Sequence, residues 1–149
     1  MQQNHNTTIN RKTMRATEPI NELTPADEAR RYVENARTLL IEKAKLDPET
    51  QFYRDRKYVR MAGNTLWNGV LLILDATFSI NNKSKGRPSI KDYRILVGNR
   101  DKKLLTYVNA AYDTMHLAMG YDGNLRKSVS QDGLLFANEI IKRCERILE

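Results

Sequence analysis

The sequence of 149 residues is poor in the side chains that hold a chain together covalently or through a metal. It has a single cysteine, Cys144, and two histidines, so it can form no internal disulfide and no clustered zinc site. The longest apolar run, residues 70–74, is too short to cross a membrane, and the first residues hold no apolar stretch long enough for a secretion signal. We therefore expect a cytoplasmic protein with no membrane partner, no metal and no cofactor.

Motifs of the common enzyme classes are also missing. The sequence has no glycine-rich phosphate loop, no zinc-protease HExxH pattern and no nucleophile elbow. No pair of carboxylates lies at helical spacing on an otherwise apolar face. This favours a protein that is not an enzyme.

Basic residues outnumber acidic ones, and the excess is local. The net charge is +7, and residues 61–103 contribute +5 of it through eight basic and three acidic side chains. The eight are Lys83, Lys85, Arg87, Lys91, Arg94, Arg100, Lys102 and Lys103. Such a cluster attracts phosphates or an acidic partner, or it only keeps a loop solvated. We take these residues as a candidate basic binding surface.

The pattern along the chain separates a tail from one helical domain. Residues 1–23 are rich in Asn, Thr and Gln and lack apolar periodicity, so we expect a polar N-terminal tail. Thr24 followed by Pro25 and Asp27 is a typical helix start. Residues 24–149 are long enough for one apolar core and form the predicted helical-bundle domain.

Amphipathic spacing predicts four long helices and one short helix. The first runs to about residue 46, the second begins near Asp55 and reaches residue 78, and the third is a short helix over about 90–97, capped by Ser89 and ended by Gly98. The fourth opens at Asp101 and ends near Gly120 in a left-handed cap, and the last begins at Ser128 or Ser130. No strand pattern competes. We predict an all-α antiparallel up-and-down bundle of four long helices plus one short connector helix.

The second helix is the predicted centre of the bundle, because its residues 66–78 are apolar on almost every side. Its predicted buried face includes Met61, and that of the last helix includes Leu135 and Leu148. Gly63 and Gly69 weaken the second helix intrinsically by about 1 kcal/mol each relative to alanine. We expect them to let another backbone approach closely.

Few residues are candidates for chemistry. His116 is the one histidine inside a predicted helix, and Tyr112 and Asp113 precede it by four and three residues, so the three could form a small polar cluster. A packed or surface histidine is the plainer alternative. Trp67, next to Leu66, either covers a seam of the core or, if exposed, marks a dimer contact.

Three stretches carry a family resemblance: residues 29–36 at the start, residues 58–63 in the second helix, and residues 112–116 with 120–121 at the end of the fourth. With their order along the chain, they resemble the HEPN-like helical bundles of bacteria, in particular an uncharacterised branch of small single-domain proteins. The resemblance covers residues 26–148 and implies the order of helices in the bundle.

Catalytic members of that superfamily are ribonucleases with an arginine shortly before a histidine on the same helix. Here the matching positions before His116 are Asn109, Ala110 and Ala111, so the arginine is missing. The resemblance therefore implies a non-catalytic interaction or accessory module, with a homodimer, a protein partner or nucleotides as partners. The alternative is an RNA-processing nuclease or a nucleic-acid-binding bundle that uses His116, Tyr112 and the basic segment 83–103.

Overall fold

The computed structural model describes residues 22–80, 86 and 88–149, and helices account for 79% of these residues. The helices are α2 (Pro25–Thr38), η1 (Leu39–Ala44), α3 (Arg56–Phe78), α4 (Ile90–Arg100), α5 (Lys102–Ala111), η2 (Tyr112–Tyr121) and α6 (Lys127–Leu148). The segments η1 and η2 are wider, π-type turns that continue α2 and α5 without a break. The described residues contain no strand, and the all-α class is confirmed.

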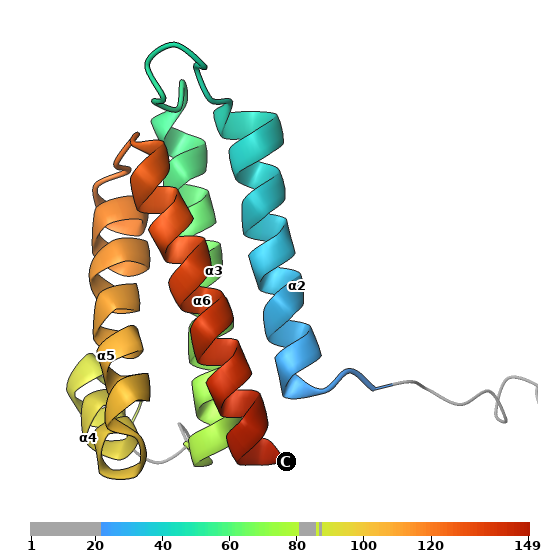
Figure 1. The fold of residues 1–149 in the computed structure, drawn as a ribbon, viewed down its shortest axis with the longest axis vertical. Coiled ribbons are helices and arrows are strands. Elements are labelled where there is room, and N and C mark those ends of the chain that lie inside the picture. The colour runs from blue at the N-terminus through green and yellow to red at the C-terminus, as the bar shows by residue number, and fades with distance from the viewer. Residues whose placement is uncertain (1–21, 81–85, 87) are drawn as a thin grey trace, which may run out of the picture.

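The long helices run alternately up and down beside one another (Figure 1). α2 leads to the loop at one end of the bundle, α3 returns, α5 with η2 runs back, and α6 returns again. The short helix α4 lies beside the first part of α5. None of the described helices is both long enough and apolar enough to cross a membrane.

Helix α3 is the centre of the bundle, as its sequence predicts. It packs on α2, η1, η2 and α6, and along it Val59, Leu66, Ile73 and Leu74 are completely buried. A helix with neighbours on most of its sides buries apolar residues at nearly every position of those sides. The remaining side of α3 is open, and the groove described below lies along it.

The prediction for the two glycines of α3 is confirmed. A Cβ atom on Gly63 would lie 2.5 Å from Met119 Cβ and 2.6 Å from the backbone nitrogen of Gly120. One on Gly69 would lie 2.7 Å from Tyr32 Cβ. The glycines thus let η2 and α2 approach α3 more closely than any larger residue would allow.

Local signals place most helix starts correctly. Thr24 accepts a hydrogen bond from the Asp27 amide at 3.1 Å, and Asp55 caps α3 in the same way. Ser89 and Asp92 form a reciprocal capping box at the start of α4. Asp101 accepts from the amides of Lys103 and Leu104, both at 3.0 Å, at the start of α5. Each cap satisfies amides that have no partner within the helix.

The cap at Thr24 gives a first prediction. Thr24→Ala removes an acceptor from the first turn of α2, and we expect the free energy of unfolding to fall by about 1 kcal/mol, measured by chemical denaturation followed by circular dichroism. Thr106→Ala is the matched control, because Thr106 is exposed inside α5 and its hydroxyl donates to the Lys102 carbonyl of its own helix, away from the helix ends. Equal stability of the two variants would contradict a role for the cap.

Several predicted boundaries are wrong. Gly98 does not end α4, because the helix continues to Arg100. Instead, Gly98 makes room for Leu105, whose Cδ2 atom lies 3.0 Å from the position that a Cβ atom on Gly98 would take. Gly120 is not left-handed. η2 continues past it to Tyr121, and the left-handed residue is Gly123, with φ of 64°. The last helix begins at Lys127, before either predicted serine.

Three residues predicted to be buried are instead exposed: Met61, Leu135 and Leu148. Met61 lies on the open side of α3, where Asn64 and Asn68 are also exposed. Leu135 lies on the outward side of α6, and Leu148 is in its final turn. Apolar character alone therefore does not show which side of a helix has a neighbour.

Cys144 is fully buried in α6, and burial raises the pKa of its thiol to about 11. Because this pKa lies above the value of 9.0 for a thiol in water, the protonated thiol contributes stability that is complete below pH 9.0 and is lost as the pH rises through about 11. We expect the native protein to react slowly with a thiol reagent at about pH 8, and the unfolded protein to react rapidly. Equal rates would show that the thiol is accessible in the folded state.

Candidate functional site

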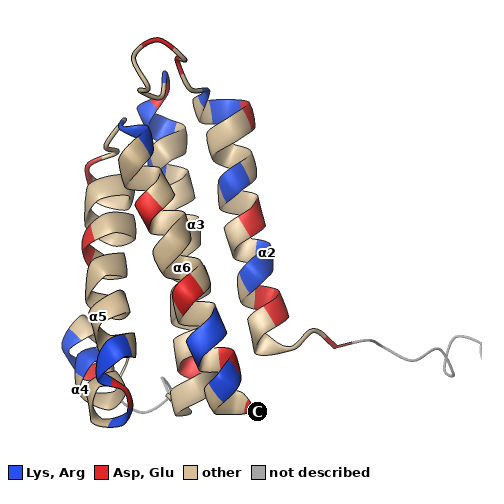
Figure 2. Ribbon diagram, viewed as in Figure 1, with Lys and Arg blue, Asp and Glu red and all other residues tan. Residues whose placement is uncertain are grey.

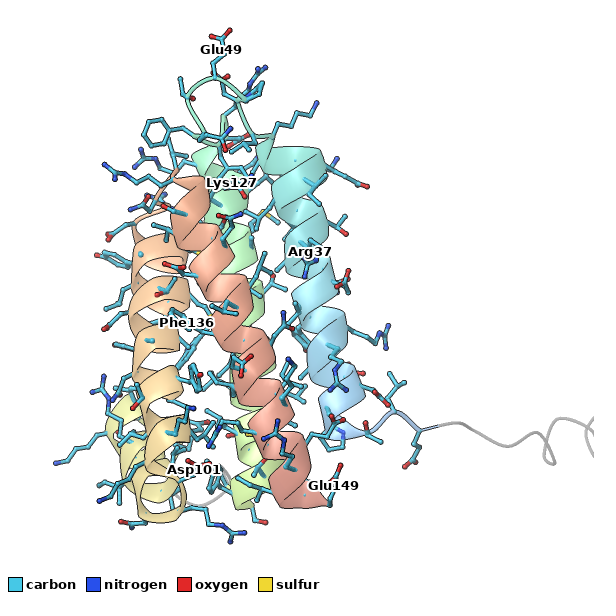
Figure 3. The ribbon with its side chains drawn as sticks, viewed as in Figure 1. Arg37, Glu49, Asp101, Lys127, Phe136 and Glu149 are labelled. Carbon is cyan, nitrogen blue, oxygen red and sulfur yellow. The ribbon has the colours of Figure 1, made fainter. Side chains whose placement is uncertain are left out.

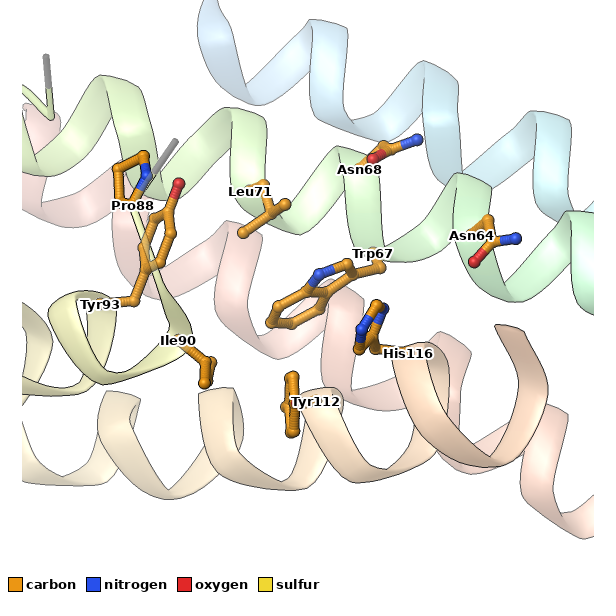
Figure 4. A pocket seen from close by; sticks show the side chains of 9 residues that line it. All are labelled: Asn64, Trp67, Asn68, Leu71, Pro88, Ile90, Tyr93, Tyr112 and His116. Atoms are coloured by element: carbon orange, nitrogen blue, oxygen red, sulfur yellow. The ribbon is translucent and has the colours of Figure 1, made fainter. Parts of the chain in front are cut away.

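A hollow of about 380 Å³ opens on the side of the bundle between α3, α4 and η2, and we call it the groove. Its lining is shown in Figure 4 and consists of Asn64, Trp67, Asn68, Leu71, Pro88, Ile90, Tyr93, Tyr112 and His116. Four of these residues come from α3, where spacings of three and four place them in one row along the helix. The groove therefore follows the open side of α3.

Three aromatic rings meet in the groove. The ring centroids of Trp67 and Tyr112 are 5.6 Å apart in an edge-to-face arrangement, those of Trp67 and His116 are 5.8 Å apart, and those of Tyr112 and His116 are 5.1 Å apart. Trp67 is only 8% exposed, whereas Tyr112 and His116 are half-buried. Trp67 thus covers a seam of the core, and an exposed dimer contact at this residue is excluded. Asp113 is exposed and does not line the groove, whereas Asn64 and Asn68 of α3 line it together with His116.

The path of η2 brings His116 to this place. Its turns are wide, and the amide of Asp122 bonds to the carbonyl of Leu117, five residues earlier, at 2.9 Å. Gly120 faces Asn64 on α3, with no room for a Cβ atom between them. The close crossing of α3 and η2 near Gly63 and Gly120 holds the histidine beside Trp67. Wide turns of this kind occur often at functional sites.

Helix α4 forms one wall of the groove, and two polar contacts hold it against α3 and α5. The hydroxyl of Tyr93 donates to Asp75 Oδ1 of α3 at 2.6 Å. Arg94 Nε donates to Asn109 Oδ1 of α5 at 2.7 Å, and the Arg94 guanidinium carbon lies 5.4 Å from the centroid of the Tyr112 ring. A guanidinium from α4 therefore contacts the α5–η2 helix next to the aromatic cluster.

The structure divides the predicted basic surface. Lys91, Arg100, Lys102 and Lys103 are exposed on α4 and on the first turn of α5, near one end of the bundle (Figure 2), and we call these four the basic corner. Arg94 is half-buried and points to Asn109 and Tyr112 instead. Lys83, Lys85 and Arg87 lie outside the described residues.

The acidic residues next to the basic corner are already engaged. Asp92 is held in the capping box with Ser89. Asp101 accepts from the Leu104 amide and, at 3.3 Å, from Arg143 Nε, and these bonds lower its pKa. None of the four cations of the basic corner forms an ion pair with a residue that the structure describes.

The lining of the groove combines aromatic faces, two carboxamides and one imidazole. A flat, polar, uncharged ring matches such a lining through stacking and carboxamide hydrogen bonds.

Sequence reasoning missed Asn64, Asn68, Tyr93, Pro88 and Ile90 as groove residues. The useful signal was the pair of asparagines four residues apart on a helix that is otherwise apolar, with a tryptophan between them. Two polar residues on one face of a buried helix mark a side that is open to solvent.

Comparison with known proteins gives a family and a fold. The family model described as Domain of unknown function (DUF5618) matches residues 24–146. A solved structure of a protein of unknown function from Dyadobacter fermentans is similar, with 35% sequence identity and a TM-score of 0.75, over 84% of this chain and 96% of that chain. No curated protein matches the sequence.

Proposed function

We propose, from the premise that this chain belongs to the DUF5618 family of domains of unknown function, that it is a non-catalytic HEPN-like helical bundle. It acts as an interaction or accessory module, and the basic corner meets an acidic or phosphate-bearing partner. The single observation that carries this proposal is the set of four exposed cations without an ion-pair partner among the described residues. A cluster of unpaired surface cations raises the rate and specificity of association with an anionic surface.

Two further features support the proposal. A short helix, α4, precedes the helix with His116, which is the order that a HEPN-like bundle implies. On the helix of His116, the positions of the superfamily's arginine hold Asn109, Ala110 and Ala111, so the nuclease pair of that helix is absent. A bundle of this kind recognises a partner without chemistry of its own.

Affinity capture from the native host tests this function. The wild-type chain is compared with a Lys91→Glu, Arg100→Glu and Lys102→Glu variant, and with a Lys43→Glu control at the far end of the bundle, where Lys43 is exposed. We expect the triple variant to lose the captured partner and the control to keep it, with capture falling as salt rises. Identical capture by all three chains would contradict a role for the basic corner.

A second candidate function, an RNA-processing nuclease or a nucleic-acid-binding bundle, is favoured by one contact. Arg94 comes from α4, yet its side chain reaches Asn109 and Tyr112, next to the positions where the superfamily's arginine would stand. An arginine supplied from another helix could stabilise a phosphate beside His116.

Single-stranded RNA distinguishes these possibilities. If the chain is a nuclease, we expect cleavage by the wild type and none by His116→Ala or Arg94→Ala, while Asp113→Ala stays active. If it only binds nucleic acid, the RNA stays intact and its affinity falls steeply with salt. If the chain shows neither RNA cleavage nor salt-dependent RNA binding, this second candidate is eliminated.

A further inference from the structure

The polar side chains that line the groove have hydrogen-bonding capacity that the bundle does not use. Asn64 and Asn68 are exposed and His116 is half-buried. None of these three side chains forms a hydrogen bond with a residue that the structure describes. A carboxamide has both donors and an acceptor, and a neutral imidazole has one of each. The groove therefore offers donors and acceptors to a ligand beside its aromatic rings.

Two rings of the lining suit a flat ligand. Tyr112 and His116 lie one turn apart on η2, both are half-buried, and their ring planes are inclined by only 33° to each other. Trp67 lies behind them on α3 and is almost completely buried. Stacking on such rings adds to the gain from burying apolar area, and it requires a planar, conjugated partner. The rings therefore favour an aromatic ligand over an aliphatic one.

The lining provides no ionic group for a charged ligand. Its nine described residues include no acid, no lysine and no arginine. Two charged side chains contact the lining, and each already has a partner. Asp75 accepts from the Tyr93 hydroxyl, and Arg94 donates to Asn109. Because a charge that leaves water without an opposite charge is costly, the groove favours an uncharged ligand.

The groove is polar at one end and apolar at the other. In Figure 4, Asn64 and His116 lie on one side of Trp67, and Leu71 and Ile90 lie on the other side. The order along α3 agrees, because Asn64 precedes Trp67 by three residues and Leu71 follows it by four. Leu71 and Ile90 are half-buried and leave apolar area uncovered. A matching ligand therefore has a polar edge and, opposite to it, an apolar group.

We propose that the groove binds an uncharged, fused-ring aromatic lactam that carries a small apolar substituent. A lactam is a ring amide, and its adjacent N–H and C=O pair with the acceptor and donor of a carboxamide. The flat rings stack on Tyr112 and His116, and the substituent packs on Leu71 and Ile90. The groove holds about 380 Å³, near the lower end of the range of about 300–1,000 Å³ for small-molecule sites, which fits two fused rings. This site is separate from the basic corner, so the inference goes beyond the proposed function.

Isothermal titration calorimetry with carbostyril, a two-ring aromatic lactam, tests the site. We expect the wild type to bind carbostyril, and to bind its N-methyl derivative about tenfold more weakly, because methylation removes the donor and leaves a carboxamide acceptor unpaired. A propyl group on the benzene ring of carbostyril should strengthen binding about tenfold through apolar contact. A carboxylate at the same position should weaken binding about tenfold, because the lining has no cation to meet it.

Two variants separate the ends of the groove. Asn64→Ala with Asn68→Ala removes both carboxamides at exposed helical positions, where alanine favours the helix, and should bind carbostyril and its N-methyl derivative equally. Leu71→Ala should keep the preference for the lactam donor and lose the gain from the propyl group. The control is Lys102→Glu, which follows Asp101 near one end of the bundle (Figure 3), does not line the groove and should bind as the wild type does. Circular dichroism confirms that the variants are folded.

A wild type that does not bind carbostyril would overturn the inference. Equal binding of the N-methyl derivative, tighter binding of the carboxylate, or a preference for the lactam donor that survives in the double asparagine variant would also overturn it. A gain from the propyl group that survives Leu71→Ala would contradict the orientation of the ligand. None of these results bears on the basic corner, whose function is tested by affinity capture alone.

Discussion

Trp67→Ala is expected to lower the free energy of unfolding by about 3–5 kcal/mol, the largest effect of any substitution considered for this chain. The side chain is 8% exposed and lies against the rings of Tyr112 and His116. Its removal loses the burial of a large ring, opens a cavity in the floor of the groove and leaves two half-buried rings without their neighbour. Because domains unfold with only about 5–15 kcal/mol, such a loss removes a large share of the stability.

Urea denaturation followed by circular dichroism measures this loss. Trp67→Phe is the matched control, because it keeps an aromatic ring and should lose only about 1–2 kcal/mol. Leu71→Ala, at a half-buried position of the same groove, should also lose less than Trp67→Ala. A loss below about 1 kcal/mol for Trp67→Ala would mean that the groove has no rigid floor.

Gly63→Ala is expected to destabilise the chain by about 2 kcal/mol, although alanine is the better helix former. The intrinsic gain is about 1 kcal/mol. However, the new Cβ atom would lie 2.5 Å from Met119 Cβ, 2.6 Å from the Gly120 nitrogen and 2.7 Å from the Met115 carbonyl oxygen. The last two are backbone atoms, which cannot turn away as a side chain can. Relief requires α3 and η2 to move apart, and overpacking of this kind typically costs about 1–3 kcal/mol or more.

Gly98→Ala is the control for Gly63→Ala. It is also a glycine inside a helix, but the nearest atom to its new Cβ would be Leu105 Cδ2 at 3.0 Å, the end of a flexible side chain. We expect the thermal midpoint to change little for Gly98→Ala and to fall by several degrees for Gly63→Ala. A Gly63→Ala variant as stable as Gly98→Ala would contradict the close crossing of α3 and η2.

Local chemistry explains what could be predicted from the sequence. Caps such as Thr24, Ser89 and Asp101 depend on residues within one turn of each other, so the sequence contains the whole signal. The apolar character of α3 likewise showed that it is the central helix. Gly98 and Gly120 misled the prediction because a helical glycine can serve either as a stop or as a gap for a neighbour, and only the neighbouring helix decides which.

The groove could be predicted only in part, because its walls come from three helices. His116 and Tyr112 were candidates, but the side of α3 that faces them depends on how the helices pack. Arg94 was assigned to the basic surface as a charge, whereas the structure turns it toward Asn109, 15 residues further along the chain. A contact between helices of this kind leaves no periodic trace in the sequence.

Trp67 also gives the protein a built-in optical reporter. It is the single tryptophan of the chain, and it forms the floor of the groove beside His116 and Tyr112. Excitation of indole alone therefore reads the environment of this one place, without a label and without background from another tryptophan. A small molecule that enters the groove changes the emission of the indole, so libraries of nucleotides and other flat ring compounds can be screened on the unmodified chain.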